Sequence, residues 1–541
     1  MPITIFKKYK ATSDLGLLLQ ALGIATFLVT ILSLVFFPQW ETNDDLVMSM
    51  IAHGYGLASQ GGPNIFFSNI IWGHLVRLIP EINGVLGYSI ATAGVLIITA
   101  TTLLYGLMKL GFDILTSLAL LVLIFLRPVL FPQFTINSGL LMVASIISIY
   151  LYSQEKKWPW LIASCLLAYC SYLIRAQEAI LIFLVSLPLL PWRFFLAHRT
   201  PKIALALLMP LVVISATIND RAYQDDSWNA FMALNPVREQ FTDWGVGENL
   251  KQRPDLLKKY GYSENDIELV TRWFFVDHNI ANPSTLKSMI GELHALSNFS
   301  DSLVNATKGL KTFLLSPALA PLVLAGIVLA IVIPSWEVGL AWCLSLGAAA
   351  AIGFLGRPGV ERIYIPLASL LFIAPLLIQN RKHQPLKKGL DRFVLTMLCC
   401  ATLANTYVVI NQNKWAANNA NSLSKGLAGF PSATVVAWGI AFPYEAAYPV
   451  YRQSSLTKSF HFYGLNVFSL APFSNTIKSN SAESFTDLLL SKQGIPIIAT
   501  EQNFSNLALY CSEHYQGKLL RMESIPYGQI SIFPSRCAVD R

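Results

Sequence analysis

Residues 15–37 read LGLLLQALGIATFLVTILSLVFF, an uncharged run long enough to cross a membrane as one helix. A helix needs about 20 mainly apolar residues to span the hydrocarbon core. The basic residues Lys7, Lys8 and Lys10 precede this run, and no small-residue cleavage site follows it. We therefore expect a retained first transmembrane helix rather than a removed signal peptide.

Similar apolar runs recur along the chain and predict about eleven transmembrane helices. They lie near residues 15–37, 85–108, 114–131, 138–153, 159–174, 178–192, 203–217, 313–333, 338–355, 363–379 and 393–411. The composition agrees, because the 541 residues are 54% hydrophobic and 13% charged. About a quarter of residues are charged in a soluble globular protein. The expected fold class is a polytopic α-helical membrane protein.

The net charge of +8 comes from short Lys and Arg clusters between the apolar runs, with no basic face, so nucleic acid is not an expected partner. Counting the runs from a cytoplasmic N-terminus places these clusters in the cytoplasm, as the positive-inside rule requires. They are Lys109, Glu155 to Lys157, Arg193 to Lys202 and Arg381 to Lys388. The same count puts the larger polar segments, about 38–84, about 218–312 and everything after about 412, outside.

From Gln412 onward the apolar runs are too short to span a membrane, and turn residues separate them. The expected domains are therefore a transmembrane domain at 1–411 and a small α/β domain outside the membrane at 412–541. Its expected strands are 433–438, 495–499 and 529–533, and its expected helices are 484–490 and 504–515. In an oxidising compartment Cys511 and Cys537 could close a loop of about 25 residues, worth roughly 3 kcal/mol on the chain-entropy model. Two free thiols are the alternative.

The sharpest local signal is Asn43-Asp44-Asp45, just after the first apolar run. Adjacent carboxylates at the start of an amphipathic interfacial helix could divide two tasks. One would take a proton from a hydroxyl, and the other would orient that hydroxyl or hold a divalent cation. A structural role is equally open, with Asn43 as helix N-cap, the acids complementing the helix dipole and Gly54 ending the helix.

Ionisable residues are nearly absent from the middles of the runs, which weighs against a proton-coupled pump. They gather instead at the expected outer ends of helices. These residues are Arg127, Arg175, Glu178, Arg357, Glu361 and Arg362. Such a distribution suits a site at the membrane surface, where a lipid-borne phosphate meets a water-soluble group.

This order of features resembles the C-type glycosyltransferases (GT-C fold), which use polyprenyl-phosphate sugars. Asn43-Asp44-Asp45 with Gly54-Tyr55 is similar to the paired-Asp motif of mycobacterial arabinosyltransferases. It is also similar to the Asp-Glu motif of protein mannosyltransferases and lipid A aminoarabinose transferases. Segments 62–73, 174–178, 235–238 with Asp243, and 356–362 look like segments of uncharacterised bacterial members. The chain lacks the Trp-Trp-Asp signature of oligosaccharyltransferases, so the resemblance does not identify the acceptor.

The resemblance implies a bacterial inner-membrane enzyme with a periplasmic C-terminal domain. It would transfer a sugar, with inversion, from a polyprenyl-phosphate donor to a glycan, lipid or protein acceptor. Asp44 would be the general base and Asp45 a helper, with Mg²⁺ or Mn²⁺ as a possible cofactor held by both. Arg357, Arg362 and Arg175 would bind the donor phosphate. Glu178, Arg238, Asp243 and Glu361 are candidate substrate or loop contacts.

Plainer roles are open for the same side chains. Arg357 and Arg362 could snorkel to the interface or pair with Glu361. Arg175 and Glu178 could neutralise each other, and Arg238 and Asp243 could form a salt bridge within one loop. At the level of the whole protein, the alternatives are a non-catalytic transporter or flippase of a lipid-linked glycan, and a polysaccharide polymerase or ligase.

Overall fold

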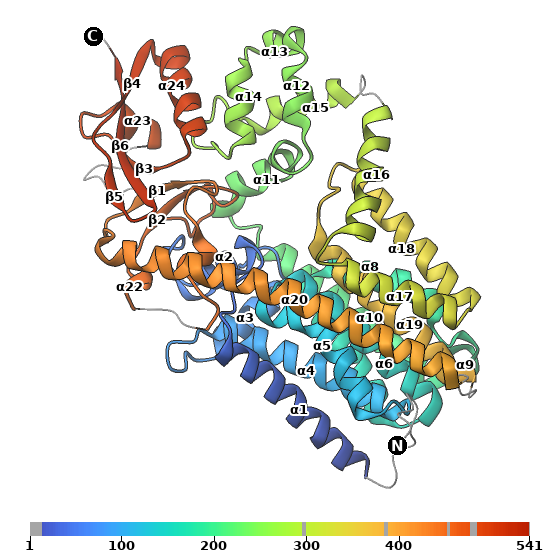
Figure 1. The fold of residues 1–541 in the computed structure, drawn as a ribbon. Coiled ribbons are helices and arrows are strands. Elements are labelled where there is room, and N and C mark those ends of the chain that lie inside the picture. The colour runs from blue at the N-terminus through green and yellow to red at the C-terminus, as the bar shows by residue number, and fades with distance from the viewer. Residues whose placement is uncertain (1–12, 295–298, 383–387, 452–454, 476–483, 540–541) are drawn as a thin grey trace.

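The computed structural model describes residues 13–294, 299–382, 388–451, 455–475 and 484–539. The basic residues Lys7, Lys8 and Lys10 and the loop 383–387 lie outside the described residues. A bundle of apolar helices makes up one half of the molecule, and a sheet with a group of shorter helices covers one end of it (Figure 1). We call the covered end the sheet side of the bundle and the uncovered end the opposite end.

Seven helices of the described chain are long and apolar enough to cross a membrane, which makes the chain a multi-pass membrane protein. They are α1 (Asp14–Val35), α4 (Gly87–Lys109), α6 (Phe134–Glu155), α10 (Arg199–Arg221), α18 (Trp336–Phe354), α19 (Glu361–Lys382) and α20 (Lys388–Gly426). An eighth span is possible where α16 (Phe299–Leu315) and α17 (Ala320–Val332) meet at a bend of 83°.

This count is lower than the eleven expected, although each expected segment is mainly helical. The remaining three expected spans are the shorter apolar helices α5 (Ile114–Leu130), α7 (Trp158–Ile174) and α8 (Ala176–Ser186). The 17 residues of α5 rise by only about 25 Å, which is less than the roughly 30 Å of a hydrocarbon core. Length, and not apolar composition, therefore separates these three helices from the seven longer ones.

Helix α6 is buried along nearly its whole length and packs against α4, α7, α8 and α19. Small residues allow this close approach. A Cβ on Gly139 would lie 2.3 Å from Pro366 of α19, and Ser145 donates to the Ser164 carbonyl of α7 at 2.8 Å. In contrast, α1 and α10 expose apolar side chains such as Leu15 and Leu207, which suits contact with lipid.

At the opposite end, four charged side chains join the ends of four helices. Lys109 of α4 donates to Asp14 of α1 at 2.8 Å and contacts Glu155 of α6 at 2.7 Å. Lys157, which precedes α7, also pairs with Asp14. We call Asp14, Lys109, Glu155 and Lys157 the opposite-end cluster. The contacts place these residues on one side of the bundle, as the charge pattern predicts.

The sheet contains six strands in the described chain, in the order β2-β1-β3-β6-β4, with β5 paired to β6. They are β1 (Val435–Trp438), β2 (Phe462–Leu465), β3 (Ile495–Ile498), β4 (Gly517–Arg521), β5 (Ile525–Tyr527) and β6 (Ile530–Val539). β1 runs parallel to β2 and β3, with Val435 opposite Phe462 and Val436 opposite Ile497. β6 is antiparallel to β3 and β4. The three expected strands correspond to β1, β3 and β6, whereas β2, β4 and β5 were not expected.

Helices α23 (Phe485–Leu490) and α24 (Glu501–Tyr515) match the two expected helices of this region. Cys511 of α24 and Cys537 of β6 form a disulfide that ties the helix to the sheet. Two further short helices, α21 (Tyr444–Ala447) and α22 (Ser455–Lys458), lie between β1 and β2. Helix α20 has 39 residues and continues past residue 411 to Gly426, close to the first strand.

The sheet region (435–539) forms hydrogen bonds with the polar segment after α1. The Phe462 amide donates to the Gly56 carbonyl at 2.9 Å, and the Ser59 amide donates to the Phe473 carbonyl at 2.8 Å. The Asn475 side chain also donates to Gly56 at 2.6 Å. Residues 56–59 therefore act as an extension of the sheet edge, although they are far from it in the sequence.

A second polar segment, between α10 and α16, folds into a group of helices beside the sheet (Figure 1). These helices are α11 (Asn229–Thr242), α12 (Val246–Lys251), α13 (Pro254–Tyr260), α14 (Glu264–Thr271) and α15 (Pro283–His294). Their core is shared with the sheet, because Phe274 packs on Trp438 with ring centroids 5.4 Å apart. The Trp438 indole also donates to the Arg272 carbonyl at 2.5 Å. Both polar segments and the sheet thus meet over one end of the bundle.

Candidate functional site

The paired acids lie in α2 (Asn43–His53), which packs against α3 (Ile70–Leu78), α4 and α21. Every residue from Asp45 to Ala52 is buried. The prediction of an amphipathic interfacial helix is therefore wrong, because the sheet region covers the face that would meet water. The expected N-cap is wrong as well: Thr42 occupies that position, and Asn43 is the first helical residue. Gly54 ends the helix as expected, with φ of 72° and its amide bonded to the Met50 carbonyl at 2.7 Å.

Asp45 is fully buried. Its Oδ1 accepts from the Tyr88 hydroxyl at 3.0 Å and from the Phe134 amide at the start of α6 at 2.9 Å. Its Oδ2 has no hydrogen-bond partner among the described residues. Burial, reinforced by the neighbouring Asp44, raises the pKa of Asp45 well above its usual range. This side chain is therefore suited to positioning α2 against α4 and α6, and not to proton abstraction.

Asp44 has a different environment because adjacent helical side chains point about 100° apart. Its side chain remains 27% exposed, and its Oδ2 lies 3.1 Å from Nη1 of Arg362 in α19. Two neighbouring acids therefore play separate roles in the fold. Asp45 is enclosed, and Asp44 is open to an incoming group.

Arg175 lies at the junction between α7 and α8, where the backbone is extended. Its Nη1 donates to the Phe67 carbonyl at 3.1 Å, and its guanidinium lies 5.4 Å from the centre of the Phe134 ring. Burial and the nearby Arg362 lower the pKa of Arg175, and Asp44 acts in the other direction. No carboxylate of the described chain lies within ion-pair distance of it, so its charge is only partly compensated.

Arg357 and Arg238 approach the same area from two further elements. Arg357, in the turn between α18 and α19, has Nη2 3.9 Å from Asp243 and Nη1 3.6 Å from Glu239. Arg238 of α11 has Nη1 3.7 Å from Asp243 and donates twice to Asn235 Oδ1, at 2.7 and 3.0 Å. Burial raises the pKa of Asp243 and lowers that of Arg238.

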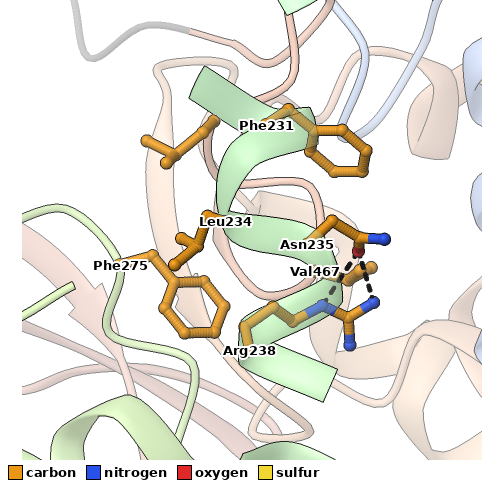
Figure 2. Close-up of a pocket in the computed structure, with 7 residues that line it drawn as sticks. Phe231, Leu234, Asn235, Arg238, Phe275 and Val467 are labelled. Carbon is orange, nitrogen blue, oxygen red and sulfur yellow. Dashed lines mark hydrogen bonds between the residues drawn. The ribbon is translucent and has the colours of Figure 1, made fainter. Parts of the chain in front are cut away.

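Figure 2 shows Arg238 and Asn235 on one side of α11, joined by their two hydrogen bonds. They line a small pocket with the aromatic rings of Phe231 and Phe275. Val467, from the loop after β2, also lines this pocket. The expected salt bridge between Arg238 and Asp243 is present. It is shared with Arg357, however, so it does not serve only the loop.

Six of the residues singled out from the sequence therefore converge. We call them the sheet-side cluster: Asp44, Arg175, Arg238, Asp243, Arg357 and Arg362. Besides these contacts, Asp44 interacts electrostatically with Arg175 and Arg238. Four guanidinium groups gather here, with Glu239 as a further carboxylate beside Arg357. Guanidinium groups suit an anionic ligand.

Two expected site residues have other partners. Glu361 accepts a hydrogen bond from the Ser316 hydroxyl, and it forms no ion pair with Arg357 or Arg362 among the described contacts. Glu178 is buried against α6, and one of its oxygens would lie 3.0 Å from a Cβ on Gly139. That oxygen has no hydrogen-bond partner in the described chain. The expected mutual pair of Arg175 and Glu178 is not within ion-pair distance there.

Glu445, in α21 of the sheet region, was missed. It interacts electrostatically with Asp44, and burial raises its pKa. The Asn43 amide nitrogen, in the orientation that satisfies both groups, donates to Glu445 Oε2 at 2.8 Å. Residue 445 follows an apolar strand in a separate part of the chain, so no local pattern connects it to α2. Glu239 and Tyr88 were missed for the same reason.

The paired acids do not form a compact set of metal ligands. In the described residues the ligand atoms of Asp266, Glu513 and His514 come within 4.8 Å of one another, where α14 meets α24. His514 contacts Asp266 there at 2.8 Å, and this hydrogen bond raises the pKa of His514. A cation held by Asp44 and Asp45 remains a prediction.

Comparisons of this chain with protein-family models, with curated proteins and with solved structures found no match, so the function is argued from the site itself.

Proposed function

We propose that the chain is a membrane glycosyltransferase that moves a sugar from a polyprenyl-phosphate donor to an acceptor hydroxyl, with Asp44 as general base. The observation that carries the proposal is the contact of Asp44 with Arg362, within a cluster that also holds Arg175 and Arg357. One accessible carboxylate thus lies among several guanidinium groups, at the end of a bundle of apolar helices.

The chemistry needs both kinds of group. Asp44 accepts the proton of the acceptor hydroxyl as its oxygen bonds to the anomeric carbon of the sugar. The bond from that carbon to the phosphate oxygen breaks, and the phosphate leaves with the electron pair. Arg362, Arg357 and Arg175 stabilise this charge, because a planar guanidinium donates to two phosphate oxygens at once. Attack opposite the leaving phosphate inverts the sugar.

The location of the cluster supports a lipid-borne donor. Arg175 lies between two apolar helices, and Arg362 is in the first turn of α19, which has the composition of a membrane span. A phosphate at the membrane surface could reach both while its hydrocarbon tail stays in lipid. The proposal includes the eleven-span topology, a cytoplasmic N-terminus, a periplasmic sheet region and the bacterial inner membrane. A divalent cation is optional for this chemistry.

The test is transfer by the purified full-length protein in lipid nanodiscs. Undecaprenyl-phosphate sugars with a radiolabelled sugar are supplied with a detergent-extracted envelope fraction as acceptor. Label should move from the lipid to the acceptor, and Arg362→Ala should reduce that movement. Binding of the donor without consumption, together with its passage across a vesicle membrane, would instead identify a flippase.

Orientation has its own test. Reporter fusions at Lys388 and Arg541 should report the cytoplasm and the outer compartment, respectively. Cytoplasmic activity at both positions would contradict a periplasmic sheet region.

A further inference from the structure

Tyr88, the second residue of α4, contacts both ends of the helix that carries the paired acids. Its hydroxyl donates to Oδ1 of Asp45, near the start of α2, at 3.0 Å. Its backbone amide donates to Nε2 of His53, the last residue of α2, at 3.1 Å. The Tyr88 ring also packs edge-on against Trp40, which precedes α2, with ring centroids 5.7 Å apart. One residue thus contacts α2 at its two ends and the segment before it.

These contacts are buried, so water cannot readily replace them. Tyr88 and Trp40 are each 2% exposed, and Asp45 is fully buried. Loss of one partner would leave a buried polar group without its hydrogen bond, which costs more than the bond itself contributes. The backbone is also closely packed here, because a Cβ on Gly87 would lie 3.2 Å from Cε1 of His53. The start of α4 therefore has little freedom to move relative to α2.

His53 can accept this hydrogen bond only while its Nε2 is unprotonated. Burial, followed by the positive charge of Arg77, lowers the pKa of His53 to about 4. Lys458 also lowers this pKa, and Glu81 raises it. The first amides of a helix have no partner within the helix, and Leu86, the N-cap residue of α4, offers no side-chain acceptor. The neutral His53 ring supplies that acceptor at neutral pH.

The contact with Tyr88 is connected to Asp44 through its neighbour Asp45. The same Asp45 oxygen accepts from the Phe134 amide at the start of α6, and α6 packs against α19. Helix α19 carries Arg362, which lies 3.1 Å from Asp44. The position of Asp44 relative to Arg362 therefore depends on how firmly α2 is held against α4 and α6.

We propose that Tyr88 is a positioning residue, which holds α2 so that the Asp44 carboxylate stays beside Arg362, and that His53 supports it from the other end of α2. This inference rests on the proposed function for the role of Asp44. Tyr88 acts through Asp45 and not on the substrate. Asp45→Asn retains a side-chain oxygen for the same bond, so it should spare catalysis where Tyr88→Phe does not.

The first readout is sugar transfer by the full-length chain in nanodiscs. Tyr88→Phe removes the hydroxyl and keeps the ring and the amide. His53→Leu removes the acceptor, whereas His53→Gln returns one near the position of Nε2. Tyr88→Phe and His53→Leu should lower kcat about tenfold to a hundredfold, as expected when a reacting group is displaced by about 1 Å. His53→Gln should restore most of kcat. Affinity for undecaprenyl phosphate should stay unchanged, because the arginines proposed to bind it lie outside α2.

Hydrogen exchange followed by mass spectrometry is the second readout, and it does not depend on turnover. The amides of residues 43–53 should exchange faster in Tyr88→Phe and His53→Leu than in the unmodified chain. Tyr105→Phe is the matched control, because Tyr105 lies about 25 Å from Tyr88 along the same helix and stacks on Trp160. It should leave transfer and exchange unchanged.

Faster exchange of residues 43–53 with normal kcat would give Tyr88 a structural role alone and overturns the inference. Equal exchange in all the proteins, or the same loss of kcat in Tyr105→Phe, overturns it as well. If Tyr88→Phe does not fold, the comparison of His53→Leu with His53→Gln decides. If the unmodified chain transfers no sugar, the proposed function fails, and the exchange of residues 43–53 alone decides whether Tyr88 holds α2.

Discussion

The two ends of the helix bundle carry charged clusters that differ in how closely their charges are paired. In the opposite-end cluster, Asp14, Lys109 and Glu155 form contacts of 2.7 to 2.8 Å, and each charge has a partner. In the sheet-side cluster, Arg362 lies 3.1 Å from Asp44 and Arg357 lies 3.6 and 3.9 Å from its two acids. Arg175 has no ion-pair partner among the described residues.

The difference distinguishes a structural cluster from a candidate binding site. Two lysines and two acids compensate each other and join helix ends. They leave nothing for a ligand to neutralise. The sheet-side cluster has longer ion pairs, and Arg175 has none among the described residues, so its guanidinium groups can still bind an anion. The ion-pair distances, more than the number of charged residues, therefore distinguish the two ends.

The largest expected effect comes from Asp44→Asn. An amide is not a base at neutral pH, so sugar transfer should fall about a hundredfold or more. Donor binding and detergent stability should stay near those of the unmodified chain, because the amide keeps the shape of the side chain. A radiometric transfer assay on both proteins measures this. Near-normal transfer with bound donor would leave Asp44 as only the ion-pair partner of Arg362.

The second largest effect should be that of Arg362→Ala on the affinity for the donor lipid. A charge-assisted hydrogen bond contributes about 1.5–3 kcal/mol, so affinity for undecaprenyl phosphate should fall about tenfold to a hundredfold. Arg362→Lys should recover part of this loss, because an ammonium lacks the planar fork. Lipid titration followed by tryptophan fluorescence gives the affinity. The same affinity in all three proteins would exclude Arg362 as a phosphate ligand.

Asp45→Asn should change the pH dependence of stability more than it changes catalysis. The folded state holds the Asp45 proton more tightly than the unfolded state, because its folded pKa is raised. Its contribution to stability is thus full at low pH and falls as pH rises above the usual Asp value of about 4. The variant has no Asp45 proton to lose. The Tm of the variant minus that of the unmodified chain should therefore increase between about pH 5 and about pH 8. A Tm difference that is independent of pH would contradict a raised pKa.

The smallest effect should come from Asp14→Asn, the matched change in the opposite-end cluster. Asp14 is 48% exposed, so its ion pairs should stabilise the fold by no more than about 1 kcal/mol. Transfer and donor binding should be unaffected. Thermal unfolding and the transfer assay test this together. A loss of transfer comparable to that of Asp44→Asn would remove the distinction between the two clusters.

Local patterns predicted much of the fold. The apolar runs marked the helices, and the composition after Gln412 marked three strands and two helices. Helix lengths were less accessible, because α5, α7 and α8 are apolar and yet short. The burial of α2 could not be predicted from the sequence either, since it depends on α21, about 400 residues later in the chain.

The sequence also predicted part of the candidate site. Arg362 and Asp44 stood out because charges are rare beside apolar runs, and the structure brings them together. Glu361 stood out for the same reason but bonds to Ser316. Proximity in sequence to an arginine did not predict which acid would face it. Glu445 has no local signal, since only the tertiary packing of the sheet region places it near Asp44.

The contact between residues 56–59 and the sheet edge has a consequence for biogenesis. The segment carrying Asp44 leaves the ribosome early, and its partners Phe462, Phe473 and Asn475 leave it some 400 residues later. Until then, the Gly56 carbonyl and the Ser59 amide lack their final hydrogen bonds. The segment that follows Asp44 therefore reaches its final contacts later than the first membrane helices can form. A nascent chain inserted in the membrane therefore lacks these contacts until its sheet region has folded.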